Sequence, residues 1–493
     1  MKKVLLLVAV MMVTVGARGQ AITLTKGAEG KTVDVEMVQN GIYVCSDEGF
    51  HYWLTRTEDG PKSFVREDDW QLVKVDRDLN VAGRLELPQT NRCAVAVSMR
   101  DEGRAAIVLV DSSDRQRTVL LRAVVELDSM QLEGHKIDTL AKYEYGKKDR
   151  CLVWSATSQD GAYWGVLALV QHTAQRQYEA EAMIYSRSME QLWRREYAVG
   201  TVEDMVVTSE GEMVTLGKER EGGEELFLFN LLTPRTSETY RVTVGCDPVQ
   251  EIRIANVVDR RVVCMGTFAP WNADPDDRLT GGVMSMAFDL DSASMPHFTM
   301  RPFENEDVNI LLNKKTKKVQ KDREVPMVTP LAVAPTPYGA VMAFGHRYVL
   351  RSRNSNGTVT TTYYAQGIHL VAVDNGGEMM WVKNLRRNDQ TDDDDAMLYM
   401  ALFAHEGTVC LVKKEHKKYP SDYNIAKEAQ EFEMEDKGNL VLYRVDEEGE
   451  VKKDVLEKKT KHSLLSAAKV NEGKVLLLTA HGNKTRMMEV DFE

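Results

Sequence analysis

Three stretches of the chain place residues that can do chemistry close together. The first is the loop 271–282, in which Trp271, Asp274, Asp276 and Asp277 precede a Gly-Gly pair. Such carboxylates are suited to Ca²⁺, and a tryptophan offers a ligand an aromatic platform. Their spacing does not follow the Asp-x-Asp-x-Asp-Gly order of an EF-hand loop, so a solvated turn is the alternative.

The second stretch is the acidic run Asp392, Asp393, Asp394 and Asp395. Adjacent carboxylates repel one another, so a bound cation would stabilise them. These four residues are the candidate metal site, although no cofactor is predicted for the chain and Ca²⁺ is the alternative to that prediction. An exposed run of charges on an acidic surface is the alternative.

The third stretch is His346-Arg347-Tyr348, which leaves an expected strand towards a loop. A histidine, an arginine and a tyrosine together can bind an anion or a polar ligand, so these three residues are predicted to bind ligand. The alternative is a cluster at a strand end whose partners lie within the fold.

Catalytic motifs are absent from the sequence. The ten histidines are dispersed, and the chain has no Gly-x-Ser-x-Gly elbow, P-loop or Gly-x-Gly-x-x-Gly segment. No catalytic residue is therefore predicted. A pair of carboxylates brought together from distant segments stays possible, since sequence alone does not place such a pair.

These residues are embedded in a repeated strand–turn pattern. The clearest copy is 368–385, an apolar strand, the turn Asp374-Asn-Gly-Gly377 and a second strand. We count about eight copies, spaced by roughly 45 to 85 residues, and such a period is typical of propellers or solenoids. The other copies lie at 70–76, 124–128, 183–186, 226–230, 284–289, 440–446 and 487–491.

The period-2 patterning predicts an all-β chain: a single β-propeller of eight, alternatively seven, four-stranded antiparallel blades. The short strand 21–25 is expected to complete the last blade and close the ring. Trp70, Trp193 and Trp381 fall in strands, where they are expected to pack blades. The segment 425–434 has the composition of a short helix. The expected blades are 31–87, 88–145, 146–199, 200–245, 246–303, 304–390, 391–460 and 461–493 with 21–25.

One turn also points to a family. Trp154-Ser-Ala-Thr-Ser-Gln-Asp160-Gly161 resembles the Trp-Ser-x-Asp-Gly turn of secreted propellers of the TolB type, but lacks the proline and has wider spacing. Over residues 20–493 the chain resembles secreted bacterial β-propellers in general. That resemblance implies a fold and a habit of binding across one face or the central channel, not an activity.

The N-terminus predicts export. Lys2 and Lys3 precede the apolar stretch 4–15, and Ala17 and Gly19 suit a cleavage site, so 1–19 is predicted to be a signal peptide. No cysteine directly follows the predicted cleavage site, which argues against a lipid-anchored lipoprotein. No second apolar segment is long enough to span a membrane. We expect a soluble protein of the periplasm or the extracellular space.

The net charge bears on the partners of the protein, and the cysteine content bears on its disulfides. The net charge is −12, which disfavours nucleic acid as a partner. The six cysteines are scattered, so buried free thiols are favoured over disulfides. Cys246 and Cys264 are the nearest pair in sequence, and a bridge between them is the alternative.

The combined prediction is a non-enzymatic binding or scaffold protein of the bacterial cell envelope. Its loops on one propeller face would hold a protein or glycan partner. The alternative is a hydrolase or lyase that acts on extracellular polysaccharide or peptide through carboxylates in the central channel.

Overall fold

The structure is a computed structural model. It describes residues 22–26, 42–47, 49–55, 69–172, 177–198, 200–270, 278–314, 324–353, 357, 359–392, 398–417, 429–471, 473–481 and 484–492. The predicted signal peptide lies outside these residues. The described chain is all-β, with six four-stranded sheets, two five-stranded sheets and one two-stranded sheet. No described helix has the length and apolar character needed to cross a membrane.

Four sheets come from the first half of the chain. Sheet 1 contains β2 (Ile42–Asp47), β3 (Phe50–Thr55), β4 (Trp70–Val75) and β5 (Val81–Leu87). Sheet 2 contains β6 (Cys93–Asp101), β7 (Arg104–Asp114), β8 (Arg117–Glu126), β9 (Gln131–Leu132) and β10 (Asp138–Glu144), with the 3-10 helix η1 (Glu133–His135). Sheet 3 contains β11 (Arg150–Thr157), β12 (Tyr163–His172), β13 (Gln177–Ser186) and β14 (Gln191–Ala198). Sheet 4 contains β15 (Asp204–Val207), β16 (Met213–Glu221), β17 (Glu224–Leu232) and β18 (Ser237–Val244).

The second half supplies the others. Sheet 5 contains β19 (Val249–Val258), β20 (Arg261–Phe268), β22 (Gly282–Asp289) and β23 (Ser294–Pro302), and the helix α2 (Asn305–Leu311) follows it. Sheet 6 contains β25 (Val328–Thr336), β26 (Gly339–Arg353), β27 (Val359–Asp374), β28 (Met379–Asp392) and β31 (Phe432–Glu433). Sheet 7 contains β29 (Ala401–His405), β30 (Thr408–His416), β32 (Gly438–Val445) and β33 (Val451–Thr460). Sheet 8 contains β34 (Ser463–Asn471), β35 (Lys474–His481), β36 (Lys484–Phe492) and β1 (Ile22–Lys26). The small sheet pairs β21 (Leu279–Thr280) with β24 (Val325–Pro326).

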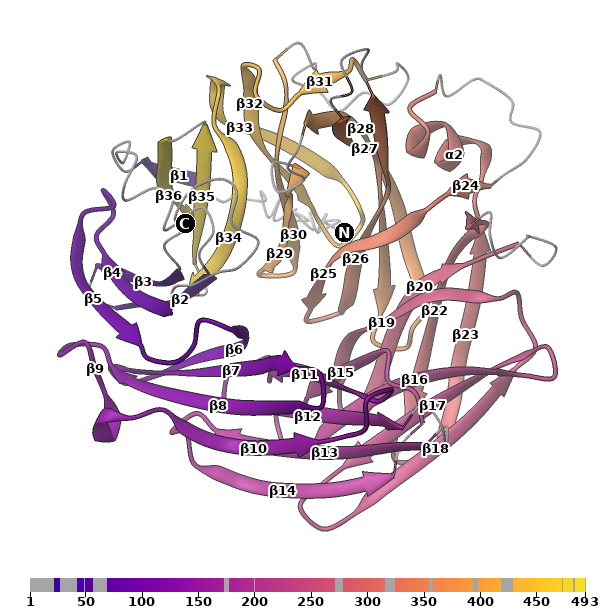
Figure 1. The fold of residues 1–493 in the computed structure, drawn as a ribbon. Coiled ribbons are helices and arrows are strands. Elements are labelled where there is room, and N and C mark those ends of the chain that lie inside the picture. Colours follow the sequence, from indigo (N-terminus) through magenta and orange to yellow (C-terminus); the bar gives the residue numbers. More distant parts are fainter. Residues whose placement is uncertain are drawn as a thin grey trace, which may run out of the picture.

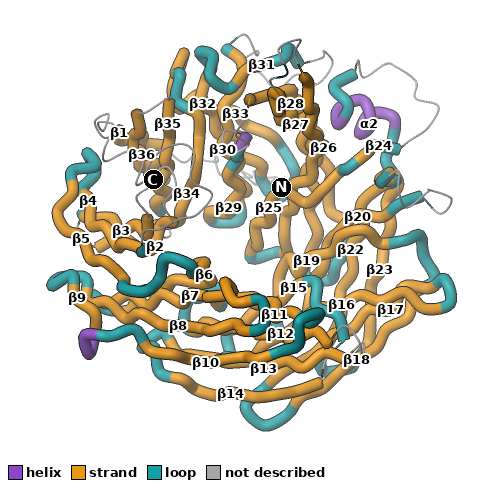
Figure 2. The backbone as a smooth tube through the Cα atoms, in the orientation of Figure 1, coloured by secondary structure: helices purple, strands orange, loops and turns teal. Residues whose placement is uncertain are grey.

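The sheets follow one another around a common centre (Figures 1 and 2). The first strands of sheets 1 to 7 contact their neighbours in chain order, from β2 to β29. β34 contacts β30 of sheet 7 and β2 of sheet 1. Within sheet 8, β1 pairs antiparallel with β36, from Ile22 opposite Phe492 to Lys26 opposite Met488. The first described strand of the chain therefore lies beside the last.

Apolar side chains fill the space between successive sheets, because the central strands carry them on both faces. Phe229 and Phe288, for example, stack between sheets 4 and 5 with ring centroids 4.3 Å apart. A further cluster between sheets 8 and 1 contains Trp53, Leu476 and Met487, each at most 1% exposed. Burying a side chain of this size contributes about 1.5–3 kcal/mol.

The hairpin 368–385 forms as its sequence predicts. The Asp374 Oδ1 carboxylate oxygen accepts hydrogen bonds from the backbone N–H groups of Gly376 and Glu378, both at 2.8 Å. Gly377 has a φ of 84°, and a Cβ atom there would lie 2.9 Å from the Ala287 nitrogen of sheet 5. The turn therefore requires glycine both for its backbone angle and for its approach to the neighbouring sheet.

The three tryptophans expected to pack blades each donate an indole N–H to a backbone carbonyl of the next sheet. Trp70 donates to Cys93, Trp193 to Gly211 and Trp381 to Glu447, at 2.9, 3.0 and 2.9 Å. These bonds satisfy the indole while its ring packs between sheets.

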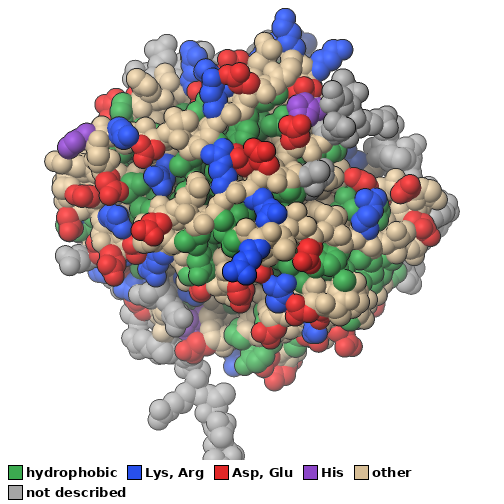
Figure 3. Space-filling model, turned by 90° about the horizontal axis from the view of Figure 1, so that it is seen from below, with side chains coloured by type: hydrophobic (Ala, Val, Ile, Leu, Met, Phe, Trp, Pro, Cys, Tyr) green, Lys and Arg blue, Asp and Glu red, His purple; other side chains and the backbone are tan. Residues whose placement is uncertain are grey.

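The outward side of sheets 2 to 4 is seen from below in Figure 3, where Lys and Arg intermingle with Asp and Glu and apolar side chains are scattered. β18 alternates exposed and half-buried residues. Charged outer strands of this kind discourage pairing with a second chain. All six cysteines are free thiols, five of them buried, which confirms the prediction and leaves no Cys246–Cys264 bridge.

Candidate functional site

The predicted site residues that the structure describes gather in sheet 6. His346, Arg347 and Tyr348 lie on β26, and Asp392 is the last residue of β28. The other predicted residues lie outside the described part of the chain: Trp271, Asp274, Asp276 and Asp277 of the first stretch, and Asp393, Asp394 and Asp395 of the second.

Sheet 6 differs from the others in the length of its central strands. β26, β27 and β28 span 15, 16 and 14 residues, whereas no described strand of the other sheets exceeds 11. The inner parts of these strands supply the cores shared with sheets 5 and 7. Their outer parts continue as a three-stranded extension with its own small core of Ala365, Leu398, Phe432 and Met434.

Bulges mark the point where the extension begins. The register shifts between Phe344 and His346 on β26 and between Gln366 and Ile368 on β27. Gly367 has a φ of 60°, and a Cβ atom there would lie 2.6 Å from the Leu311 Cα of α2. Only glycine lets the bulged strand approach the helix this closely.

At the second bulge, two buried arginines of β28, Arg386 and Arg387, lie between the paired residues Leu385 and Asn388. Arg386 Nη1 donates to the Asn309 carbonyl of α2 at 2.9 Å. Arg387 Nε donates to Asp389 Oδ2 at 2.6 Å, and its Nη2 donates to the Leu398 carbonyl at 2.5 Å. The arginines thereby fix the extension to α2 and to the start of sheet 7.

One surface of the extension, which we call the tyrosine face, carries His346, Tyr348, Thr362, Tyr364 and Asp392. The cross-strand register places them on the same side, because Tyr348 lies opposite Tyr364 and Thr362 opposite Asp392. The Tyr348 and Tyr364 rings stack at 4.7 Å, and the His346 ring lies 5.0 Å from that of Tyr348. The Thr362 hydroxyl donates to Asp392 Oδ1 at 2.6 Å.

The structure therefore brings together two of the sequence-predicted groups but divides one of them. His346 and Tyr348 share the tyrosine face with Asp392, whereas Arg347 lies opposite Ala365 and Asp389 on the other surface. There its Nη2 donates to the Leu398 carbonyl at 3.4 Å. Arg347 thus helps to hold the extension rather than joining His346 and Tyr348.

The protonation of these side chains suits recognition better than acid–base catalysis. Burial lowers the pKa of His346, so its imidazole is neutral at pH 7. Burial and the nearby carboxylate of Glu431 raise the pKa values of Tyr348 and Tyr364, so both hydroxyls stay protonated. The face thus offers aromatic rings, neutral hydroxyls and the carboxylate of Asp392.

Beneath the extension lies a buried ionic cluster that sequence reasoning did not find. Lys413 and Glu415 of β30 and Lys453 of β33 have side chains at most 4% exposed, and Glu415 lies within ion-pair distance of both lysines. The Tyr443 hydroxyl donates to Glu415 Oε2 at 2.7 Å. These residues continue the core between sheets 6 and 7, with charge in place of apolar side chains.

Burial lowers the pKa of Lys413, with the carboxylates of Asp389 and Glu415 acting in the opposite direction. A lysine with a lowered pKa can serve as a nucleophile, but a side chain 1% exposed is out of reach of a substrate. The cluster is therefore structural: it belongs to sheet 7, and Asp389 of sheet 6 attracts its Lys413. Its sequence signal was a Lys-Lys-Glu run inside an apolar strand pattern.

The segment expected to be a helix, 425–434, contributes to this region differently. Its described part, 429–434, contains β31, which pairs in parallel with β28 at Asp389 and Gln390. The helix prediction is wrong for these residues. Packing of Phe432 and Met434 into the small core outweighs their helical propensity.

A second group of carboxylates lies on the first strands of sheets 4 and 5. Burial raises the pKa values of Asp204 on β15 and Glu251 on β19, with Arg253 opposing both shifts. Asp204 Oδ2 accepts a hydrogen bond from the Ile254 N–H at 2.9 Å, which joins the two sheets. The sequence signal missed here was an acid at or near the start of each first strand.

Among the described residues, no group of three or more histidine, cysteine or acidic side chains is arranged to hold a metal ion. Of the predicted metal site, only Asp392 is described. Cation binding at the acidic run therefore stays a hypothesis.

Comparisons with known proteins give structural matches only. No family model matches the chain, and no curated protein matches it. The β-propeller domain of the Trilobed protease from Pyrococcus furiosus aligns at a TM-score of 0.35 and 10% identity, over 85% of this chain and 99% of that one. The polysaccharide lyase Uly1 aligns at 0.37 and 8%, over 95% and 100%. The Dos1 propeller aligns at 0.32 and 8%, over 80% and 92%. These are propeller-type neighbours, and at such scores they carry no argument about activity.

Proposed function

We propose that the chain is an exported, eight-bladed ring closed by β1, and that it binds a protein or glycan of the bacterial cell envelope without catalysis. The contacts of the first strands and the apolar cluster between sheets 8 and 1 support the ring. The leader pattern at 1–19 supports export.

The single observation that carries the binding proposal is the extension of sheet 6. Val349, Leu350 and Val359 are 48%, 53% and 56% exposed on it. Leu350 lies opposite Thr362 and therefore shares the tyrosine face with Tyr348 and Tyr364. Exposed aliphatic side chains beside half-buried aromatic rings on a braced, projecting sheet are typical of a surface that a partner covers.

The test is capture from the envelope fraction of the native cell with wild-type protein and two matched variants. Leu350→Glu places a charge on the tyrosine face, and Leu192→Glu places one on β14 of sheet 3, where Leu192 is 47% exposed. Both changes are on the surface, so each should alter stability by no more than about 0.5 kcal/mol. We expect a partner retained by wild type and Leu192→Glu to be lost with Leu350→Glu.

Equal capture by all three proteins would contradict the assignment of the binding surface to the extension. A glycan partner is distinguished from a protein by treating the fraction with protease before capture. If retention survives, purified envelope polysaccharides are then tested against wild type and Tyr364→Ala, since sugars stack on aromatic rings.

A specific observation also favours a second candidate, a hydrolase or lyase. Asp204 and Glu251 lie on first strands that contact each other, and burial raises the pKa of each carboxyl towards the range of a general acid. Cleavage of extracellular polysaccharide or peptide by wild type, lost in Asp204→Asn and in Glu251→Gln but retained in Glu224→Gln, would establish it. Glu224 is an exposed acid at the start of β17.

A further inference from the structure

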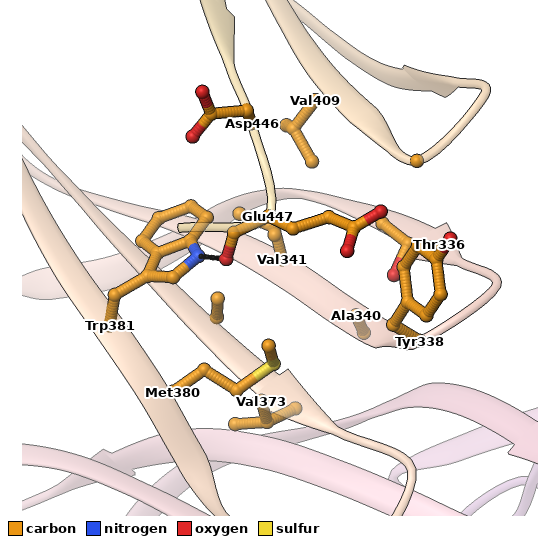
Figure 4. Close-up of a pocket in the computed structure, with 12 residues that line it drawn as sticks. Thr336, Tyr338, Ala340, Val341, Val373, Met380, Trp381, Val409, Asp446 and Glu447 are labelled. Atoms are coloured by element: carbon orange, nitrogen blue, oxygen red, sulfur yellow. Dashed lines mark hydrogen bonds between the residues drawn. The ribbon is translucent and has the colours of Figure 1, made fainter. Parts of the chain in front are cut away.

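A small pocket opens at the other end of sheet 6, between its turns and those of sheet 7 (Figure 4). The tyrosine face lies at the Arg353 end of β26, whereas this pocket lies at the Gly339 end. The two regions are separate, so ligand binding in the pocket would be independent of the proposed function.

Aromatic and thioether groups form the walls. The rings of Trp381 and Tyr338 lie on opposite sides of the opening, with Met380 below them and Val341 at the back (Figure 4). Tyr338 and Met380 are 49% and 47% exposed, whereas most large apolar side chains of the described residues are buried or half-buried. They are available to a ligand rather than buried by the fold.

A β-bulge explains why adjacent residues of β28 share the pocket. Val373 pairs with Met379 and Ala372 with Trp381, so Met380 is the extra residue. In a regular strand Met380 and Trp381 would point to opposite faces, and the bulge turns both towards the opening.

The Trp381 ring is held in place before any ligand arrives. Its indole N–H donates to the Glu447 carbonyl at 2.9 Å. A Cβ atom at Gly449 would lie 2.9 Å from Trp381 Cγ, so the glycine lets the β32–β33 turn sit close against the ring. A fixed ring loses little entropy on binding.

Negative charge borders the opening. The Tyr338 hydroxyl is hydrogen-bonded to the Glu447 carboxylate, which raises the pKa of Tyr338. Asp446 Oδ1 accepts the Glu450 N–H at 2.7 Å. In the part of the chain that the structure describes, neither Asp446 nor Glu447 forms an ion pair with a lysine or arginine.

We propose that this pocket binds an alkylated ammonium group. The negative faces of indole and phenol rings attract a cation, most strongly one that water hydrates weakly. Methyl groups on the nitrogen would contact Met380 and Val341, while Glu447 balances the charge. The head group belongs either to a free quaternary amine or to a methylated lysine of a partner protein.

The experiment uses the full chain labelled with 5-fluorotryptophan, whose seven signals report the seven tryptophans. Trp381→Phe identifies the signal of Trp381. Choline chloride and N-acetyl-trimethyllysine methylamide are titrated separately against a sodium chloride reference, and 3,3-dimethyl-1-butanol serves as the neutral isostere of choline. We expect a saturable shift of the Trp381 signal with the cations and none with the alcohol. Tighter binding of one cation than of the other identifies the source.

Two variants test the role of charge. Glu447→Gln keeps a partner for the Tyr338 hydroxyl but removes the carboxylate, and we expect at least fivefold weaker binding of choline. Glu448→Gln, at the exposed acid next along the chain, should leave the affinity unchanged.

Thermal melting confirms that each variant is folded, and Tyr338→Ala replaces Glu447→Gln if that variant is not. The proposal is overturned if the alcohol binds as well as choline, if both glutamine variants bind like wild type, or if 50 mM choline leaves the signal unshifted.

Discussion

Two pairs of neighbouring sheets, 3 with 4 and 6 with 7, are packed differently, and of these four sheets only sheet 6 has a fifth strand, β31. Between sheets 3 and 4 the core is built from apolar side chains, with Leu167, Ile184, Trp193 and Met213 buried. Between sheets 6 and 7 a similar apolar core, with Leu370 and Leu411, continues into the buried charges around Glu415. The long strands and the braced extension also belong to sheet 6.

The comparison separates what the fold needs from what has been added to it. Apolar packing between two-sided strands is sufficient to hold neighbouring sheets together, as sheets 3 and 4 show. Charges at the same depth cost desolvation energy, and their attraction offsets that cost only while every partner is present. The region that carries the candidate site should therefore be the more sensitive to loss of a single partner.

The largest expected effect comes from breaking the ionic cluster. Glu415→Gln leaves Lys413 and Lys453 buried without their carboxylate and should lower the free energy of unfolding by about 3–5 kcal/mol. Urea unfolding monitored by circular dichroism measures it. Glu448→Gln, an exposed acid of the same sheet, should change it by no more than about 0.5 kcal/mol.

Replacing the whole cluster sharpens the comparison. The quadruple variant replaces every member of the cluster with an apolar side chain: Lys413→Met/Glu415→Leu/Tyr443→Phe/Lys453→Met. The interface between sheets 6 and 7 then becomes apolar, like that between sheets 3 and 4. Such replacements are neutral or stabilising by about 1–4 kcal/mol in other proteins. If the quadruple variant is less stable than Glu415→Gln, the buried charges stabilise the fold by more than the desolvation energy that they cost.

An intermediate effect is expected from the tryptophan bonds between sheets. Trp193 is buried, and Trp193→Phe leaves the Gly211 carbonyl without its donor, at a cost of about 1–3 kcal/mol. Trp381 is only half-buried, so water can replace its bond to Glu447, and Trp381→Phe should cost about 0.5–1.5 kcal/mol. Equal losses in urea unfolding would contradict this ranking of the two interfaces.

How far the sequence predicts these regions depends on whether the signal is local. The hairpin around Asp374 was predictable because its turn residues bond their own backbone and its strands alternate. The buried Lys413 and Glu415 were not, since charged residues in a strand are normally exposed and their partners come from distant strands. Nor were the bulges near Gly367 and Met380, because register depends on the facing strand. The tyrosine face was half predicted: His346, Tyr348 and Asp392 were singled out, but only the pairing of β26, β27 and β28 brings them together.

The smallest expected effect concerns acid, where the two regions should respond with opposite sign. His346 of sheet 6 has a lowered pKa because it is buried, so below about pH 6.5 the unfolded chain binds a proton that the folded chain does not. Its contribution makes stability fall as pH falls from 6.5.

His172 of sheet 3 is more exposed and has a raised pKa through Asp149 and Glu179, against the opposing effect of desolvation. Its contribution is present below pH 6.5 and is lost as pH rises through the folded-state pKa.

Thermal melting between pH 7.5 and 5.0 distinguishes the two histidines. His346→Gln should lessen the loss of stability on acidification, because the proton uptake on unfolding is removed. His172→Gln should make that loss slightly steeper, by less because its ion pairs are near solvent. If both variants follow the wild-type profile, the acid sensitivity comes from other groups, of which buried His51 and His369 share the lowered pKa. If His346→Gln steepens the profile, the imidazole is protonated in the folded protein, and the tyrosine face would then carry a cation beside Tyr348.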